Sequence, residues 1–438
     1  MLTVQFAIVI IAILIGARLG GIGLGVMGGL GLAVLVFVFG LPPTSPPIDV
    51  ILMIAAVISA AAAMQAAGGL DYLVKIAEHL LRKNPKHITL LSPLVAYAFT
   101  FLAGTGHVAY SILPVISEVA QDAKIRPERP LAVSVIASQQ AITASPISAA
   151  TVALLALLSP YGYSLFDILK VSIPATLAGI IIAAIFSMKQ GKELVNDPEY
   201  INRLKEGLLQ KPSTKSKKIN DIYKSRISVY IFIAATFLVV IFGSFQRMRP
   251  SFIIDGKLTS IGMPAIIEIV MLSTSALILL FTRTKGMEAA KGSVFSAGMQ
   301  AVVAIFGIAW MGDTFIKGNI TGIMGDIQSI VTQMPWLFGL ALFIMSILLF
   351  SQAATVRAIM PLGLTLKLSP ILLIAFFPAV NGYFFFPNYP TVVAAINFDR
   401  TGSTHIGKYL LNHSFMKPGL IATGIAMLVG YILIHLYW

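Results

Sequence analysis

The sequence predicts an all-α polytopic membrane protein made of two inverted halves, and three observations support this class. The chain of 438 residues is 57% hydrophobic and only 11% charged, whereas soluble domains carry about 25% charged residues. Several apolar runs approach the length of about 20 residues that crosses a bilayer. Two apolar segments in each half are interrupted at corresponding places by small, polar or proline residues. Paired breaks of this kind are typical of inverted repeats in secondary transporters.

Ten apolar runs define the predicted membrane spans, five in each half. In the first half they are residues 2–17, 22–41, 48–67, 131–158 and 165–188. In the second half they are residues 227–245, 262–282, 293–312, 370–398 and 416–437. The N-terminal run is interpreted as a span because no basic segment or signal-peptide cleavage site accompanies it. We therefore predict a first repeat over 1–188, a linker over 189–226 and a second repeat over 227–438.

Two further apolar stretches, residues 88–119 and 335–366, are predicted to be re-entrant hairpins. Each has a break near its middle, and the arms of the first stretch contain 16 and 13 residues. Helical arms of that size reach about 20–24 Å, short of the hydrocarbon core of about 30 Å. Each half is therefore expected to combine five transmembrane helices with one hairpin.

The distribution of Lys and Arg supports this topology. With two hairpins, 24 of the 31 basic residues fall in segments on the cytoplasmic side, including the connector 189–226. A full crossing by either stretch would move the following basic segments to the other side and remove the asymmetry. Both termini are then outside. The formal charge of +13 follows from topology and indicates no nucleic-acid partner.

The connector 189–226 is the one long polar segment, and it contains the basic run Lys211–Lys218. A cytoplasmic linker between the repeats is the simpler interpretation. A patch that binds lipid headgroups or regulates the protein is the alternative.

Enzyme motifs receive little support. The stretch Gly23–Gly28 matches G-x-G-x-x-G, but it lies in an apolar span and not between a strand and a helix. Close helix packing is its predicted role. The chain has no cysteine and no G-x-S-x-G or H-E-x-x-H motif, so we predict no catalytic residue, cofactor or metal site. An intramembrane enzyme is kept only as a third hypothesis.

The hairpin tips carry the strongest signal for binding. A break inside a bilayer strands backbone polar groups and is tolerated only where protein or a wet cavity satisfies them. A helix N-terminus at such a break carries partial positive charge and binds carboxylates. Glycine packing without a ligand is the alternative. The substrate-binding residues predicted around the tips are Gly104, Thr105, Gly106, His107, Ser351, Gln352, Thr355 and Arg357.

A second pair of breaks, Thr143–Ser148 and Pro387–Thr391, follows the two hairpins. Proline removes a backbone donor and frees the carbonyl one turn back, which gives an ion or a substrate a partner. A proline kink without a ligand is the alternative. The substrate-binding residues predicted here are Thr143, Ser145, Ser148, Asn388, Tyr389 and Thr391.

The charged residues near the breaks favour an anionic substrate. A buried Arg is costly at membrane depth, and the planar fork of Arg357 suits a carboxylate; the alternative is an Arg that snorkels to the surface. His107 is interpreted as a donor, a proton carrier or a packing residue. Glu268 is the only acidic residue in the middle of a predicted span, whereas cation exchangers usually rely on buried Asp or Glu.

Several stretches resemble the anaerobic four-carbon dicarboxylate transporter family, Dcu, over essentially the whole chain. They are Gly16–Ile22, Ala67–Asp71, Leu81–Lys86, Ala103–Gly106, Ile125–Pro127 and Thr404–Lys408. Ser351–Thr355 and Tyr389–Thr391 look most like the DcuA branch, which exchanges aspartate, fumarate and succinate. Asn388 stands where that branch leads us to expect Thr.

The resemblance implies an antiporter of the bacterial inner membrane, with both termini periplasmic. It would take fumarate, malate or aspartate inward and succinate outward. A coarser similarity to the divalent-anion/sodium symporters of the ion-transporter superfamily implies a homodimer with an elevator mechanism. A cation–proton exchanger or a sodium-coupled anion symporter is the alternative. The expected partners are small dicarboxylates and the lipid bilayer.

Overall fold

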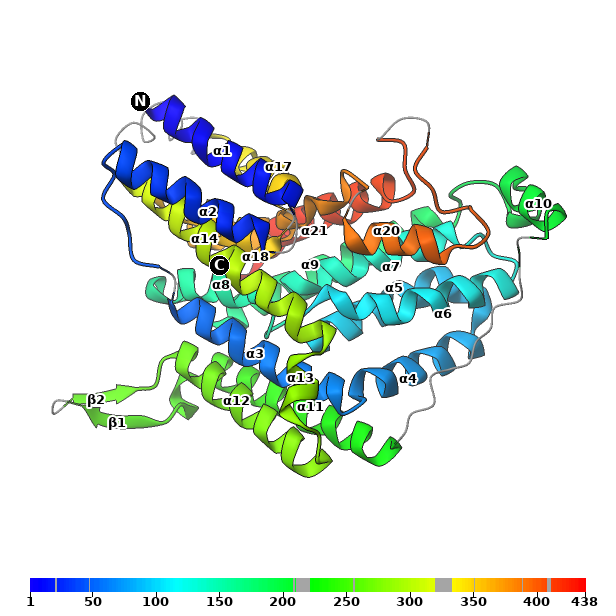
Figure 1. Ribbon diagram of the computed structural model, residues 1–438, viewed down its shortest axis with the longest axis horizontal. Coiled ribbons are helices and arrows are strands. Elements are labelled where there is room, and N and C mark those ends of the chain that lie inside the picture. The colour runs from blue at the N-terminus through cyan, green and yellow to red at the C-terminus, as the bar shows by residue number, and fades with distance from the viewer. Residues whose placement is uncertain are drawn as a thin grey trace.

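The computed structural model describes residues 1–19, 22–46, 48–207, 209, 221–254, 257–319, 333–349, 351–387, 389–407 and 411–438. Helices make up most of these ranges (Figure 1). Within them, six helices are long and apolar enough to cross a membrane, or up to seven if one bent pair counts as a single span. The predicted class, an all-α membrane protein, is therefore confirmed.

The first half contains α1 (Leu2–Leu19), α2 (Gly23–Ala33), the π-helical η1 (Val34–Val38), α3 (Ile48–Ala66), α4 (Gly69–Lys83), η2 (Pro85–His87), α5 (Ile88–Ala103), η3 (Gly106–Val108), α6 (Ala109–Asp122), α7 (Glu128–Gln140), η4 (Ala141–Thr143), α8 (Ala149–Leu158), η5 (Ser159–Tyr161) and α9 (Leu165–Ser187). The connector contributes η6 (Leu194–Asn196) and α10 (Pro198–Lys205).

The second half contains α11 (Ile222–Ser244), η7 (Gln246–Met248), β1 (Ser251–Ile254), β2 (Lys257–Ser260), α12 (Met263–Thr282), α13 (Gly286–Ala290), α14 (Ser293–Gly318), α17 (Trp336–Leu349), α18 (Gln352–Thr365), α19 (Pro370–Phe376), η8 (Phe377–Phe384), α20 (Pro390–Phe398) and α21 (Met416–Tyr437). The two strands form an antiparallel hairpin that pairs Ser251 with Ser260 and projects from the helices (Figure 1).

Two helices extend well beyond the spans predicted for them. The helix expected over 293–312 continues to Gly318 and so contains Asp313, whose carboxylate is paired with Arg357 on α18. Likewise α11 begins at Ile222 and not at 227, because Asp221 caps it by accepting from the Tyr223 and Lys224 N–H groups.

Helices α5 and α6 fold back on each other. Arg82 at the end of α4 has its Nη2 atom 2.6 Å from Glu118 and its Nη1 atom 3.7 Å from Asp122, both at the end of α6. The chain therefore returns to the place where it left α4. The length argument for the first arm is weaker than expected, since η2 and α5 together form a helix of 19 residues with a mean hydropathy of 1.3, long and apolar enough to cross a membrane. The return of the chain supports the hairpin instead.

Helices α17 and α18 fold back in the same way. A Cβ atom placed on Gly363, near the end of α18, would lie 2.8 Å from the ring of Phe338 at the start of α17. The absence of a side chain at Gly363 lets the two arms approach closely. The described parts of both halves thus contain a helical hairpin followed by a helix interrupted in its middle.

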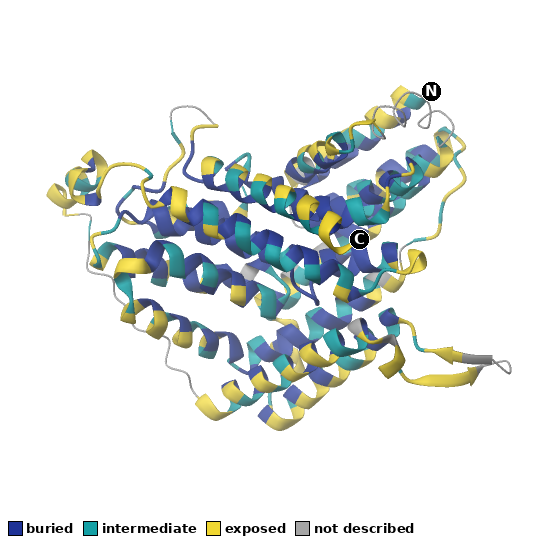
Figure 2. Ribbon diagram, turned by 180° about the vertical axis from the view of Figure 1, so that it is seen from behind, coloured by how far each residue is buried: buried dark blue, intermediate teal, exposed yellow. Residues whose placement is uncertain are grey.

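The helices pack as two joined hydrophobic clusters. The larger cluster includes α3, α5, α7, α9, α19, η8 and α21. Residues coloured as buried are concentrated in the central helices (Figure 2). The smaller cluster joins α1, α2 and α14 to Leu349 and Ala358 of the second hairpin. Large apolar side chains such as Phe237 and Leu280 are exposed on the outer helices, as expected for surfaces that face lipid.

The glycine-rich stretch in α2 packs against α14, as predicted. A Cβ atom on Gly25 would collide with the Val303 carbonyl, and one on Gly28 would lie 2.5 Å from the Gly307 carbonyl carbon. The two backbones touch because neither glycine has a side chain. The interpretation as a packing motif is confirmed.

The connector is held to both halves by a buried ion cluster. Arg126 donates to Glu128 at 2.5 Å and to Asp197, and its third nitrogen contacts the Ser403 carbonyl at 3.4 Å. Burial raises the pKa of Asp197, but donation from the Tyr200 N–H and the Arg126 guanidinium outweighs it, so the pKa is lowered overall. The start of α10 is thereby fixed beside the end of α20.

Candidate functional site

The tip of the first hairpin is a glycine turn pressed against its neighbours. Gly104 ends α5 with φ 69°, a left-handed conformation that glycine adopts without strain. A Cβ atom there would lie 3.0 Å from the Ile147 side chain, and one on Gly106 would collide with the Gln139 amide. The tip therefore contacts both the first break and the last turn of α7.

The hydroxyl groups of the first break satisfy the protein's own backbone. Thr143, Ser145 and Ser148 are completely buried. The Ser145 hydroxyl donates to the Phe101 carbonyl at 2.7 Å, and the Thr143 hydroxyl donates to the Gln140 carbonyl at 2.8 Å. These bonds satisfy carbonyl groups beside the break, which would be costly if left without a partner.

Ser148 has the same function at the start of α8. Its hydroxyl donates to the Ile142 carbonyl at 2.5 Å and accepts from the Thr151 N–H at 3.1 Å. This is an N-cap, which satisfies one of the free N–H groups of a helix start. The structure thus brings the three predicted residues of the first break together, with their protons donated to protein carbonyls.

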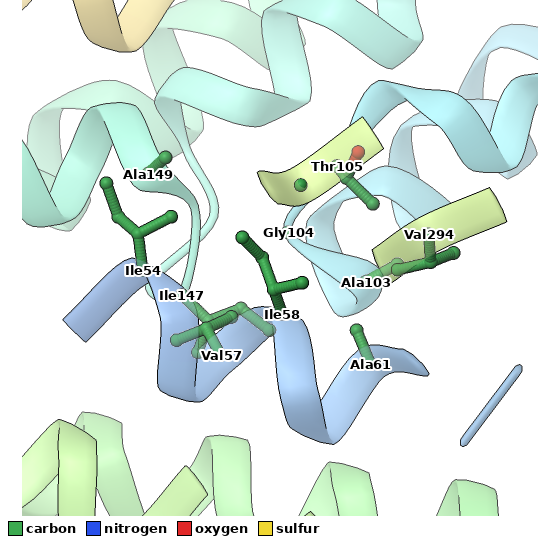
Figure 3. Close-up of a pocket in the computed structure, with 11 residues that line it drawn as sticks. Ile54, Val57, Ile58, Ala61, Ala103, Gly104, Thr105, Ile147, Ala149 and Val294 are labelled. Atoms are coloured by element: carbon green, nitrogen blue, oxygen red, sulfur yellow. The ribbon is translucent and has the colours of Figure 1, made fainter. Parts of the chain in front are cut away.

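A cavity of about 90 Å³ lies beside the first tip (Figure 3). Thr105 and Gly104 line one side of it, and Ile147 of the first break and Ala149 of α8 line another. Apolar residues of α3 and α14 complete its lining. Because Ala149 is the first residue of α8, the positively polarised end of that helix adjoins the cavity.

The tip of the second hairpin begins α18 with a capped turn. Ser351 is the N-cap, and its hydroxyl accepts from the Ala354 N–H at 3.2 Å. The buried hydroxyl of Thr355 donates to the Ser351 carbonyl at 2.8 Å. Both predicted residues therefore stabilise the helix start, and only Gln352 reaches away from it.

A chain of buried amides, which we call the amide chain, connects the two halves. The Gln352 Nε2 atom donates to Gln139 at 2.8 Å and to Asn381 at 3.2 Å. Asn381 in turn donates to Gln140 at 3.2 Å, and Gln140 donates to Thr423 at 2.9 Å. Every member is at most 7% exposed.

The amide chain links both hairpin tips through one residue. Gln139 touches Gly106 of the first tip and accepts from Gln352 of the second. Gln139, Gln140 and Asn381 are not among the site residues predicted from the sequence. The available signal was their residue type, since uncharged amides in otherwise apolar helices are costly to bury without partners.

The second break leaves a donor unused. The Thr391 hydroxyl is buried and has no hydrogen-bond partner among the described residues. Tyr389 precedes α20, and its ring packs on that of Tyr383 with centroids 4.6 Å apart. Asn388 and the side chain of His107 lie outside the described part of the structure.

Arg357 is enclosed between two helices and does not extend to the surface. Its side chain is 15% exposed, and its Nη2 atom lies 3.9 Å from the Asp313 carboxylate of α14, which is 26% exposed. The Arg357 Nε atom is buried without a hydrogen-bond partner among the described residues. Sequence reasoning overlooked Asp313 because the predicted span ended one residue before it. The snorkelling interpretation is therefore not supported.

Comparison with known proteins gives consistent matches over the full length. Residues 1–438 match the family model described as "Anaerobic c4-dicarboxylate membrane transporter". The chain is 41% identical to the anaerobic C4-dicarboxylate transporter DcuB of Escherichia coli O6:H1. It is 43% identical to the C4-dicarboxylate transporters DcuA of Wolinella succinogenes and of Escherichia coli K12. Each alignment covers 99% of both proteins.

Proposed function

Since the chain belongs to the anaerobic C4-dicarboxylate membrane transporter family, we propose that it is an antiporter of small dicarboxylates in the inner membrane. Fumarate, malate or aspartate moves inward, and succinate moves outward. The family consists of membrane transporters, so the chain is not an enzyme.

The observation that carries this proposal is the convergence of both hairpin tips on the amide chain. Dicarboxylates need hydrogen-bond donors at two ends, and each half of the chain supplies one tip. Charge-assisted bonds from neutral donors and a guanidinium are strong in a buried site. The unused hydroxyl of Thr391 and the unused Nε of Arg357 are suitable donors in the second half.

We assign different functions to the predicted residues of the two halves. Thr105 and the N-terminal end of α8 receive one carboxylate at the cavity beside the first tip. The second tip and Arg357 receive the other. Gly104, Gly106, Thr143, Ser145 and Ser148 shape the first half of this site. Ser351, Thr355, Tyr389 and the remaining predicted residues, His107 and Asn388, complete it.

The repeated order of elements supports an inverted repeat over 1–188 and 227–438. Each half has a hairpin, a broken helix and a long final helix, which are α5–α6, α7–α8 and α9 in the first half and α17–α18, α19–α20 and α21 in the second. An odd number of spans per half inverts the second copy. Alternating access then follows when one group of helices moves against the other around a central site. We infer that this is an elevator movement and that the protein is a homodimer.

Vesicle exchange tests the function. Proteoliposomes loaded with succinate should take up labelled fumarate, and empty proteoliposomes should not. No succinate-dependent uptake under any ion gradient would refute the proposal. Sodium efflux from substrate-free vesicles would instead favour a cation–proton exchanger, and uptake that requires sodium but no internal substrate would favour a symporter.

Two substitutions test the site. Because a hydrogen bond to a charged group is worth about 1.5–3 kcal/mol, Thr105→Val and Ser351→Ala should each raise the half-saturating fumarate concentration about tenfold. Ser260→Ala on the exposed β hairpin is the control and should not change it. Unchanged transport by both site variants would show that the tips are packing contacts.

Single cysteines test the topology, since the chain contains none. Cysteines at the exposed positions Lys83 and Lys124 flank the first hairpin, and Pro43 is exposed between α2 and α3. In intact cells an impermeant thiol reagent should label only the cysteine at Pro43. Labelling at one of Lys83 and Lys124 but not the other would mean that residues 88–119 cross the membrane.

A further inference from the structure

The ion pair between Asp313 and Arg357 joins two groups of helices. On one side, α14 packs through Gly307 against the backbone of α2. On the other side, α18 begins at the second tip, where Gln352 enters the amide chain. The two helices cross where Gly312 contacts Ala358, with 3.8 Å between the position of a Gly312 Cβ and the Ala358 Cα. The charged residues lie next to this crossing.

The geometry of the pair is weak for two partly buried opposite charges. The closest nitrogen–oxygen distance is 3.9 Å, whereas a good guanidinium–carboxylate pair has two parallel bonds of about 2.7–2.9 Å. The Arg357 Nε atom, which would form one of those bonds, has no partner among the described residues. Asp313 therefore neutralises the charge of Arg357 but leaves the Nε donor of the guanidinium unused.

We propose that Asp313 is the resident counter-ion of Arg357, which a carboxylate of the transported dicarboxylate displaces. In the empty carrier, Asp313 holds the second hairpin against α14. When the substrate binds, its carboxylate takes two donors of Arg357 and the contact with Asp313 is released. This inference rests on the proposed function, because it requires that the substrate be a dicarboxylate.

The displacement would explain obligatory exchange in physical terms. A carrier without substrate keeps the ion pair and stays in one state. Breaking the pair without a replacement leaves the guanidinium of Arg357, which is 15% exposed, without a counter-charge, and this is unfavourable. The released carboxylate of Asp313 is 26% exposed and can be hydrated. A bound carboxylate supplies the replacement, so only the loaded carrier moves. Asp313 thus acts as a positioning residue that couples occupancy to movement, and it does not itself contact the substrate.

Asp313→Asn in proteoliposomes tests the proposal. Efflux of labelled succinate into substrate-free medium should rise about fivefold or more over the wild-type protein, because the empty carrier can now return. The half-saturating concentration of external succinate should fall by a similar factor, because the internal competitor is removed. Asp313→Glu should behave like the wild-type protein, since it keeps the carboxylate.

Glu268→Gln is the matched control, because it removes an acidic residue from a different apolar helix, α12. Glu268→Gln should change neither the efflux of succinate into substrate-free medium nor the half-saturating concentration of external succinate. If Asp313→Asn leaves both efflux and half-saturation unchanged while the wild-type protein exchanges succinate normally, this inference is overturned and the proposed function stands. If the wild-type protein itself exchanges no dicarboxylate, the proposed function fails.

A charge-exchanged double variant, Asp313→Arg with Arg357→Asp, gives an independent measurement if the single variant does not fold. It retains an ion pair between α14 and α18 but moves the guanidinium to the other helix. We expect efflux into substrate-free medium to stay low and dicarboxylate affinity to fall at least tenfold. Wild-type affinity in this double variant would overturn the proposal.

Discussion

The two hairpin-and-break units have the same order of elements but use their polar side chains differently. In the first unit, Ser145 and Ser148 donate their hydroxyl protons to carbonyl groups of the chain itself. In the second unit, the Thr391 hydroxyl and the Arg357 Nε are buried with no partner among the described residues. The Thr100 hydroxyl in the first hairpin is also buried without a partner among the described residues, so the contrast lies between the two breaks. The first break has the features of a rigid support, and the second has the features of a recognition surface.

This difference shows that a break in a membrane helix has two separate consequences. It frees backbone groups, which the chain must satisfy, and it exposes a helix start, which a ligand can use. The first unit satisfies the freed groups with short hydroxyl side chains. The second reaches across the molecule with Gln352 and leaves donors available. Substitutions at the second break should thus affect binding, and those at the first break should affect stability.

Arg357→Gln should have the largest effect. It removes the one guanidinium of the second unit and leaves Asp313 without its partner. Loss of one member of a buried charge pair costs about 2–5 kcal/mol, so the half-saturating fumarate concentration should rise at least about thirtyfold. Arg357→Lys keeps the charge but not the fork and should give an intermediate value. A half-saturation unchanged in Arg357→Gln would place the substrate elsewhere.

The next effect concerns the link between the units. Gln139→Leu and Gln352→Leu each leave buried amide groups unpaired, at a cost of about 1–3 kcal/mol. Each should slow exchange and lower the unfolding temperature in detergent. The double variant should cost less than the two single changes together, because both remove the same hydrogen bond. Strict additivity would mean that the amide chain does not couple the two tips.

The sequence predicted the elements of both units because breaks and apolar runs are local features. Helices α5–α6, α7–α8, α17–α18 and α19–α20 all occur where the interrupted apolar stretches indicated. The end of α14 could not be predicted in this way. In the sequence, Asp313 follows the last residue of an apolar run, so the predicted span ends before it. Its contact with Arg357 is visible only in the structure.

The sequence predicted where the breaks lie but not the pairwise contacts between them. The sequence indicated that residues around Gly104, Ser145 and Gln352 would matter, and the first two meet at one turn. It gave no reason to connect Gln352 with Gln139, since the two lie in different halves of the chain. Which hydroxyl groups are used and which stay unpaired is likewise a property of three-dimensional packing.

Thr391→Val distinguishes recognition from support in the second unit. The Thr391 hydroxyl has no protein partner among the described residues, so its removal should leave the unfolding temperature unchanged or raise it slightly. If it donates to the substrate, the half-saturating fumarate concentration should rise about tenfold. Thr355→Val is the comparison, because that hydroxyl donates to the Ser351 carbonyl and its loss should lower stability. A Thr391→Val protein with normal transport would remove this residue from the site.

Ser148→Ala should give the smallest effect on transport and a clear one on stability. The substitution removes the N-cap of α8 and the donor to the Ile142 carbonyl. Loss of such a cap costs about 1 kcal/mol, so the unfolding temperature in detergent should fall while the half-saturating fumarate concentration stays the same. Ser148→Thr keeps the hydroxyl and should restore stability. If instead affinity falls and stability does not, the hydroxyls of the first break contact the substrate, and the contrast between the two units is wrong.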